Sequence, residues 1–290
     1  MNRLTKRLLF FGLAGALLFP AGNANAQPAN SGEIRLIVRG DDMGMAHSVN
    51  QACIRAYREG ILTTVEVMVP CPWFPEAAKL LRENPGLDVG VHLVLTSEWE
   101  TMKWRPLTCA PSLQAPDGNF FPTVWDDGNF PPGSNLLKSD WKLAEVEAEL
   151  RAQIELARRE IPGISHLTDH MAFTRAAPEL RAVAEKLAQE YGLKLHEQFE
   201  GLRFAGTMGE PEEKGAALIA ILEKLTPGTW IVVDHPGLDT AELRALGHPG
   251  YRNVAADRAG VTAAFTSPKV KEVVRRRKIR LIRYRDLANQ

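Results

Sequence analysis

Two adjacent carboxylates, Asp41 and Asp42, are the most informative residues of the chain. They follow an apolar run, residues 36–38, and a glycine, Gly40, an order typical of a buried strand that leaves its sheet. Two like charges this close repel each other unless one binds a cation or takes up a proton. A metal ligand beside a general base would account for the pair. The alternative is that one carboxylate caps the following helix and the other is solvated.

Histidines recur at the ends of other strand-like segments. His92 follows a Val-Gly-Val run, His166 and His170 stand four residues apart, and Asp234 and His235 end another apolar run. A lone His on such a strand is more often a satisfied core residue. Together with the Asp pair, however, these residues fall at carboxyl ends of strands, which converge at one edge of a barrel. Two imidazoles and one carboxylate make a facial metal site with open positions for water and substrate.

Strand-like and helix-like segments alternate along the chain, which predicts parallel strands joined by right-handed helical crossovers. A barrel and a doubly wound sheet both fit this order. Because a Rossmann glycine fingerprint is absent and the polar residues gather at strand ends, we expect an α/β fold with a (β/α) barrel of about seven parallel strands. The predicted strands are 34–39, 63–69, 88–95, 164–168, 193–195, 229–233 and 279–284, and the predicted helices are 48–59, 75–83, 141–159, 178–190, 212–224, 257–265 and 268–276.

Residues 96–139 interrupt this alternation after the third strand. They are irregular and rich in Pro, Gly and Asp, and their aromatic content argues against disorder. We expect a long, aromatic-rich insertion here. Its Trp99 and Trp125 could stack on a bound substrate, or they could simply anchor the insertion. Glu197, near the end of the fifth predicted strand, is a further candidate for substrate contact.

The first 26 residues have the pattern of a signal peptide. Three basic residues precede an apolar run at residues 8–19, and Ala24-Asn25-Ala26 forms a small-residue cleavage site. The apolar run is short for a membrane span. We therefore expect an exported, periplasmic protein whose mature part, residues 27–290, is one domain.

Charge and cysteine content bear on partners and on redox state. Without the three basic leader residues, the mature chain has a net charge of about −3, which favours neither a nucleic acid nor an anionic membrane as partner. Cys53, Cys71 and Cys109 remain, and an oxidising compartment would allow one disulfide among them. None of the three has metal-ligand spacing. No pattern predicts an oligomeric state.

As a whole, the sequence resembles the YdjC-like (ChbG/HpnK-type) carbohydrate deacetylases, distant relatives of the polysaccharide deacetylases. The resemblance covers nearly all of the mature chain, and its motifs occur in order. It implies a distorted (β/α) barrel and one divalent metal ion. The resembling segments are Leu-Ile-Val-Arg-Gly-Asp41-Asp42-Met-Gly, Gly60-Ile-Leu-Thr-Thr with Met68-Val69, Val89-Gly-Val-His92-Leu-Val-Leu-Thr-Ser-Glu-Trp, His166-Leu-Thr-Asp-His170-Met, His235-Pro-Gly, Thr266-Ser-Pro-Lys-Val and Leu281-Ile-Arg-Tyr-Arg-Asp-Leu.

The resemblance also implies roles for individual residues. The family's first Asp acts as base and its second as metal ligand, and these match Asp41 and Asp42. The family's two metal histidines match His92 and His170. The late His-Pro-Gly histidine, which supplies the acid, matches His235.

The chain departs from the family pattern at four places. Gly40 stands where the family often has Ala. Thr168 replaces the Asp of a usual His-x-Asp-x-His, and Ala172 replaces a further His. A second His-Pro-Gly begins at His248 in loop sequence rather than after a strand, so we assign the acid role to His235. These departures leave the metal triad intact and bear on which sugar is bound.

The sequence therefore predicts a metal-dependent hydrolase that removes an N-acetyl or similar acyl group from a small carbohydrate, with Asp41 as base and His235 as acid. Two His and one Asp suit Zn, Ni, Co or Fe as the divalent metal, and Mg less well. An iron-dependent oxygenase would use the same triad, but its jelly-roll sheet does not fit the alternating order. The non-catalytic alternative, a periplasmic metal- or sugar-binding protein, would leave Asp41 and His235 without a function.

Overall fold

The computed structural model describes residues 32–288, so the predicted signal peptide at residues 1–26 lies outside the described part. The fold is built around strand β1 (Ile34–Met43), which is buried along nearly its whole length. One side of β1 pairs with β6 (Gly228–Asp234). Its other side pairs first with β7 (Arg280–Leu281) and then, further along, with β2 (Thr64–Val67).

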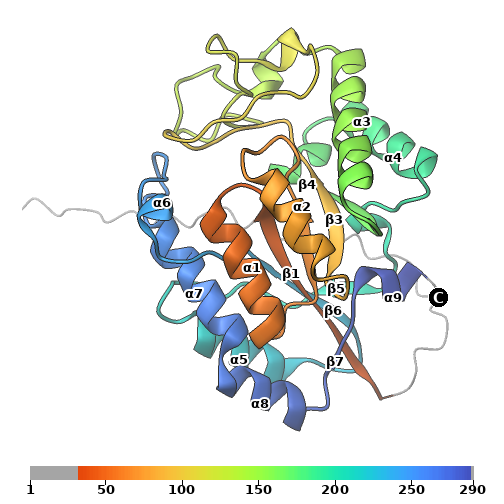
Figure 1. Ribbon diagram of the computed structural model, residues 1–290, viewed down its shortest axis with the longest axis vertical. Coiled ribbons are helices and arrows are strands. Elements are labelled where there is room, and N and C mark those ends of the chain that lie inside the picture. Colours follow the sequence, from red (N-terminus) through yellow and green to blue (C-terminus); the bar gives the residue numbers. More distant parts are fainter. Residues whose placement is uncertain (1–31, 289–290) are drawn as a thin grey trace, which may run out of the picture.

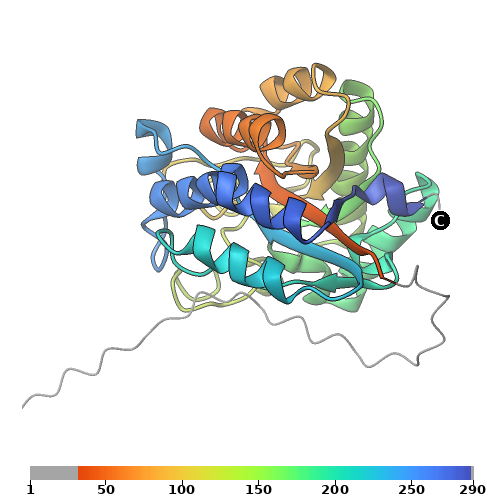
Figure 2. The same ribbon diagram turned by 90° about the horizontal axis from the view of Figure 1, so that it is seen from below.

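The sheet continues from both sides of β1. Beyond β2 lie β3 (Asp88–Leu93) and β4 (His166–Asp169), and beyond β6 lies β5 (Leu202–Phe204), so the order is β4-β3-β2-β1-β6-β5. Every ladder of this sheet is parallel. Figures 1 and 2 show the sheet curled into a half-barrel with helices around it. The predicted α/β fold with about seven parallel strands is confirmed.

The helices follow the strands and cover the outer face of the sheet, as βαβ crossovers require. Most agree with the predicted segments within a few residues. The helices are α1 (His47–Glu59), α2 (Phe74–Arg82), α3 (Leu143–Glu160), α4 (Pro178–Glu190), α5 (Lys214–Lys224), α6 (Ala241–Arg244), α7 (Val254–Thr266), α8 (Pro268–Arg276) and α9 (Tyr284–Ala288).

The two faces of the sheet are filled differently, because successive side chains of a strand point to opposite faces. Outward residues such as Leu36 and Val38 join the large apolar core beneath the helices. Inward residues near β5 and β6 form a smaller apolar cluster that includes Ile37, Ile231 and Tyr284. Towards the carboxyl end of β1 and on β2 to β4, the inward side chains are polar and buried instead: Arg39, Asp41, Glu66, His92, His166 and Thr168.

Two predicted strands differ from the structure, and one strand of the sheet was not predicted. Residues 193–195 contribute only an isolated bridge, Leu167 to Leu195, because the chain turns at once into η4 (His196–Gln198). The fifth strand of the sheet is β5, a short segment with little period-2 signal. The last predicted strand, 279–284, is reduced to β7, and Tyr284 begins α9.

Residues 96–139 contain two short 3₁₀ helices, η1 (Pro111–Leu113) and η2 (Leu136–Lys138), and otherwise irregular backbone. Figure 1 draws this segment in yellow and yellow-green, beyond the carboxyl ends of the strands. Trp104 and Phe120 are buried within it. Both side chains belong to the large apolar core of the molecule, so the segment is packed against the rest of the fold.

Two further observations concern partners and redox state. No helix within residues 32–288 is long and apolar enough to span a bilayer. Cys53, Cys71 and Cys109 are all unpaired, the first two buried and the third exposed.

Candidate active site

An irregular end to β1 brings the two predicted site carboxylates to the same edge of the half-barrel. In a regular strand, neighbouring side chains point to opposite faces. Between Gly40 and Met43, however, the register of β1 against β2 shifts. Asp42 has a φ of 69°, in the left-handed region that Asp tolerates better than most residues. Its carbonyl then accepts a hydrogen bond from the Met45 amide at 3.1 Å, which closes a turn.

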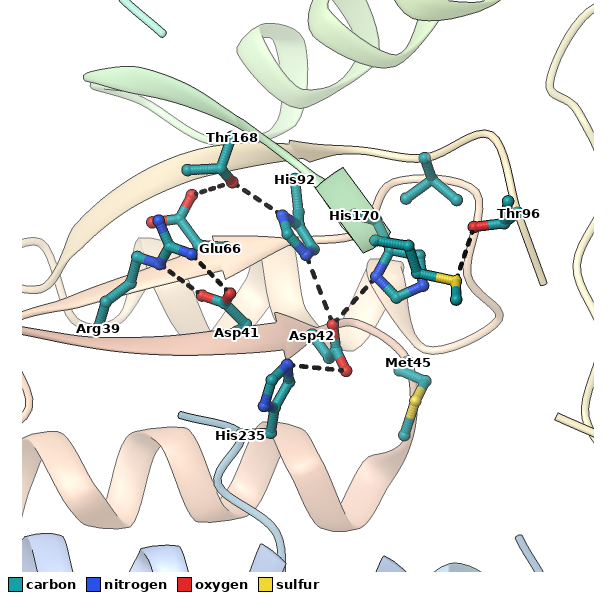
Figure 3. Close-up of polar contacts among 12 residues, drawn as sticks. Arg39, Asp41, Asp42, Met45, Glu66, His92, Thr96, Thr168, His170 and His235 are labelled. Carbon is teal, nitrogen blue, oxygen red and sulfur yellow. Dashed lines mark hydrogen bonds and ion pairs between the residues drawn. The ribbon is translucent and has the colours of Figure 1, made fainter. Parts of the chain in front are cut away.

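The Asp42 carboxylate meets two imidazoles there (Figure 3). Its Oδ1 atom lies 3.6 Å from Nε2 of His92 and 3.5 Å from Nδ1 of His170. The three donor atoms all lie within 4.8 Å of one another, and all three side chains are buried. His92 comes from β3, and His170 begins η3 (His170–Arg175) directly after β4.

This donor set fits a divalent cation. Asp42 Oδ1 is buried and has no hydrogen-bond partner among the described residues. A buried acceptor left in this way is costly, so it calls for a water or an ion. Donors bound at about 2.1 Å in tetrahedral geometry stand roughly 3.4 Å apart, close to the two separations measured from Oδ1. The three residues predicted as metal ligands therefore lie together, around one orphaned oxygen.

His170 is oriented from its far side by Glu98. Nε2 of His170 and Oε2 of Glu98 are 3.1 Å apart, which leaves Nδ1 facing Asp42. Burial by itself would lower the pKa of His170, but Glu98 and Asp42 raise it to about 10. A cation at Asp42 would therefore compete with a proton for this imidazole. The next two residues, Met171 and Ala172, both have positive φ, so the chain turns sharply away from the site.

The second oxygen of Asp42 is paired with Arg258 from α7, at 2.6 Å from Nη2. Burial alone would raise the pKa of Asp42, but Arg258, followed by His235 and His170, lowers it well below its usual value. Asp42 is therefore ionised throughout the physiological range. It can present a charged oxygen to a cation on one side while Arg258 neutralises the other.

Asp41, the predicted base, is clamped by Arg39 of the same strand. The two guanidinium nitrogens Nε and Nη2 each donate to one carboxylate oxygen at 2.8 Å. Such a bidentate pair fixes the plane of the carboxylate, and each oxygen keeps a second lone pair for another donor.

His235, the predicted acid, lies at the open side of the site. Its Nε2 is 4.0 Å from Oδ2 of Asp42, and its side chain is 42% exposed, whereas that of Asp42 is 2% exposed. Asp234 holds the ring, since its Oδ1 accepts from the His235 amide at 2.8 Å and lies 3.6 Å from Nδ1. Burial would lower the pKa of His235, but Asp42 and Asp234 raise it.

The other predicted residues lie further from the triad. Trp99 is only 2% exposed, donates its Nε1 proton to the Met45 sulfur and lies under Arg258, a placement that favours the anchoring alternative. Trp125 is 36% exposed. The side chain of Glu197 is 23% exposed, and desolvation by its surroundings is the main reason that its pKa is raised. His248, of the second His-Pro-Gly, lies among aromatic rings that include Trp99.

Several residues of the site were not found from the sequence. Arg258 and Glu98 reach Asp42 and His170 from a late helix and from irregular backbone, where no periodicity identifies them. Glu66 could have been recognised from the sequence, because it lies inside the second predicted strand. A carboxylate in an apolar strand is rarely buried without a partner, so its position indicates a buried polar contact. The four-residue spacing of His166 and His170 fits either a ligand with an orienting neighbour or two turn residues. In the structure His166 binds Glu66 (Nε2 to Oε1, 2.7 Å) and is not one of the three grouped donors.

Known proteins resemble this chain over most of its length. A carbohydrate deacetylase of Thermus thermophilus is 32% identical over 263 residues, which cover 82% of this chain and 89% of the relative. A carbohydrate deacetylase of Brevibacillus brevis is 27% identical, and the match covers 88% of this chain and 100% of the relative. A solved structure from Enterococcus faecalis, described as a proposed cellobiose-phosphate cleavage protein, superposes with a TM-score of 0.70 at 23% identity, covering 88% of this chain and 99% of that one.

The last of these similarities supports the fold, and the first two support a deacetylase. The family described as YdjC-like protein matches residues 35–276, which include all of β1 except Ile34 and every residue of the triad. The family predicted from the motifs is thereby confirmed: the chain belongs to the YdjC-like family, and its relatives include carbohydrate deacetylases.

Proposed function

We propose that this protein is a metal-dependent hydrolase that removes an N-acetyl or similar acyl group from a small carbohydrate. One observation carries the metal dependence: the buried, unpartnered Oδ1 of Asp42 faces one nitrogen each of His92 and His170. Membership of a family with carbohydrate deacetylases supports the reaction type.

Asp42, His92 and His170 would hold the cation, which their chemistry suits to Zn, Ni, Co or Fe better than to Mg. When bound, it would polarise the acyl carbonyl and make a bound water more acidic. Arg258 and Glu98 fix the two ligands that they touch, so the donor atoms need little rearrangement to bind.

In the proposed reaction, Asp41 and His235 act as general base and general acid. Asp41 accepts a proton from the attacking water as a new C–O bond forms at the acyl carbon. Protonated His235 donates a hydrogen bond to the developing oxyanion. It then gives its proton to the amine nitrogen as the C–N bond breaks, which releases acetate and the free amino sugar. The raised pKa of His235 supports this role, because the ring must carry a proton at the start.

The substrate would approach from the side where His235 is exposed. Trp125 has an accessible ring face that could stack on a pyranose, and Glu197 could accept hydrogen bonds from sugar hydroxyls. Because the first 26 residues have the pattern of a signal peptide, we also propose that the reaction takes place in the periplasm.

Acetate release from chitooligosaccharides and other N-acetyl sugars tests the proposal directly. We expect turnover of at least one of them, loss of turnover with a chelator, and recovery when Zn²⁺ or Co²⁺ is added back. Tight binding of sugar or metal without any acetate release would instead favour the non-catalytic binding protein. Cell fractionation with N-terminal sequencing tests export, and a cytoplasmic, uncleaved product would contradict it.

A further inference from the structure

Behind His92, on the side away from the solvent, three side chains form a hydrogen-bonded chain. Nδ1 of His92 lies 2.8 Å from the Thr168 hydroxyl, and that hydroxyl donates to Oε2 of Glu66 at 2.8 Å (Figure 3). All three residues are buried. We propose that Glu66 and Thr168 are positioning residues that fix the tautomer of His92 and hold its Nε2 ready to bind a cation. This inference rests on the proposed metal dependence.

The direction of each hydrogen bond follows from the number of protons available. Burial would raise the pKa of Glu66, but His166 and then Arg39 and His92 lower it to about 2, so its carboxylate can only accept. The single hydroxyl proton of Thr168 therefore points to Glu66. The Thr168 oxygen is left as an acceptor, and its neighbour Nδ1 of His92 must carry the proton.

A neutral imidazole with a proton on Nδ1 has a bare lone pair on Nε2. The bare Nε2 then faces Asp42 Oδ1, another acceptor without a partner, at 3.6 Å. Two acceptors that face each other repel unless a cation lies between them. The hydrogen bonds from Glu66 through Thr168 to His92 thus leave two lone pairs, on His92 Nε2 and Asp42 Oδ1, available to a cation.

The strand register builds this arrangement. Glu66 on β2, Gly90 on β3 and His166 on β4 are aligned across the sheet, and His92 is aligned with Thr168 one step further along. A Cβ atom at Gly90 would lie well under 3.0 Å from both Glu66 and His166. The absence of a side chain at this position is therefore what allows the Glu66 carboxylate to cross β3 and reach the β4 side.

Loss of the Thr168 hydroxyl should change the tautomer of His92. In a Thr168→Val variant, Nδ1 of His92 has no acceptor, so the ring gains by moving its proton to Nε2 and donating to Asp42 Oδ1. A cation must then displace this internal hydrogen bond before it can bind. In Thr168→Ser the hydroxyl remains, and so does the original tautomer.

The test measures the affinity of the purified protein for Zn²⁺ by competition with a chromophoric chelator. We expect Thr168→Val to weaken affinity by about 10- to 100-fold, the usual effect of removing an outer partner of a metal ligand. Thr168→Ser should restore most of it, and Glu66→Gln should weaken it in the same direction. A matched control is Thr64→Val, since the Thr64 hydroxyl is also buried on the same sheet but has no hydrogen-bond partner.

Nitrogen-15 NMR of the metal-free protein reads the tautomer directly. The His92 ring should carry its proton on Nδ1 in the wild type and in Thr168→Ser, and on Nε2 in Thr168→Val. Wild-type zinc affinity or an unchanged tautomer in Thr168→Val would overturn the inference. A wild-type protein that binds no metal, and whose acetate release survives a chelator, would overturn the proposed metal dependence itself.

Discussion

The two oxygens of Asp42 have different surroundings. Arg258 pairs with Oδ2, and the imidazoles of His92 and His170 face Oδ1. A carboxylate that is buried and ionised needs such compensation, since desolvation penalises its charge strongly. Asp41, its neighbour, is bonded by both of its oxygens to Arg39 and keeps lone pairs that can accept a proton. The two carboxylates therefore differ in their surroundings, which suits a ligand and a base.

The base role of Asp41 can be tested by Asp41→Asn. The amide cannot take a proton from water, so we expect kcat to fall by about 10²- to 10⁴-fold, the range typical of general base catalysis. Zinc affinity should stay near the wild-type value, because Asp41 is not among the three grouped donors. A variant with wild-type kcat and normal metal content would contradict the assignment.

The sequence identified the residues that stand at strand ends. Asp42, His92 and His170 were predicted as one site because carboxyl ends of parallel strands converge. The partners of these residues were harder to find, since a contact such as Arg258 with Asp42 joins positions 216 residues apart. Proximity of this kind depends on how helices pack against the sheet, and no local pattern encodes it.

At the scale of elements, Gly90 is where β2, β3 and β4 constrain one another. In Gly90→Ala, the added methyl group would collide with Glu66 and His166. We expect the free energy of unfolding to fall by about 1–3 kcal/mol, as for other overpacked cores, and zinc affinity to fall with it.

Gly215→Ala is the matched control, because a Cβ atom there meets nothing within 4 Å and the residue lies in α5. Its stability should be equal to that of the wild type or slightly higher. Urea unfolding of both variants makes the comparison. Equal stability of Gly90→Ala and Gly215→Ala would show that Glu66 and His166 can move aside.

The irregular segment 96–139 contains two Trp residues with different surroundings. Trp99→Ala removes a buried ring that touches Met45 and Arg258, so we expect a loss of about 3–5 kcal/mol in stability. Trp125→Ala removes an exposed ring and should leave stability unchanged but raise KM for a sugar. Thermal unfolding together with steady-state kinetics separates the two effects. If KM does not change in Trp125→Ala, that ring takes no part in substrate binding.

Helices and long strands were predicted within a few residues, because apolar periodicity identifies them. The strand β5 was not predicted, and the last strand was predicted to be longer than β7. Residues 193–195 have an apolar pattern but form only one bridge, whereas β5 has three residues and too little pattern to stand out. Strand pairing accounts for the difference between these two segments. All three residues of β5 pair with β6, whereas Leu195 forms a single bridge to Leu167 of β4.

At the scale of the whole molecule, the polar interior of the half-barrel makes stability depend on pH. Burial and nearby Arg39 lower the pKa of His196 to about 3, while an unfolded chain has the usual value of 6.5. Between pH 6.5 and about 3 the unfolded state binds a proton that the folded state does not. The free energy of unfolding should therefore decrease as the pH falls through this window.

Urea unfolding at several pH values measures this slope. His196→Gln keeps a side-chain acceptor near the Tyr284 hydroxyl, which lies 2.7 Å from Nδ1 of His196, but cannot titrate. The variant should lose part of the pH dependence. The same slope in variant and wild type would assign the effect to other groups.

Tyr284 closes the interior from the far end of the chain. Its ring stacks on His166 with centroids 3.7 Å apart, and its hydroxyl accepts from Arg39, a residue 245 positions earlier. Contacts that span such a separation require loop closure and slow folding. A chain made from its N-terminus presents Tyr284 long after Arg39 and His166, so the polar interior around these two residues is completed only when α9 docks. Proteolytic removal of α9 would therefore break the contacts of Tyr284 with Arg39 and His166 and leave the paired strands of the sheet in place.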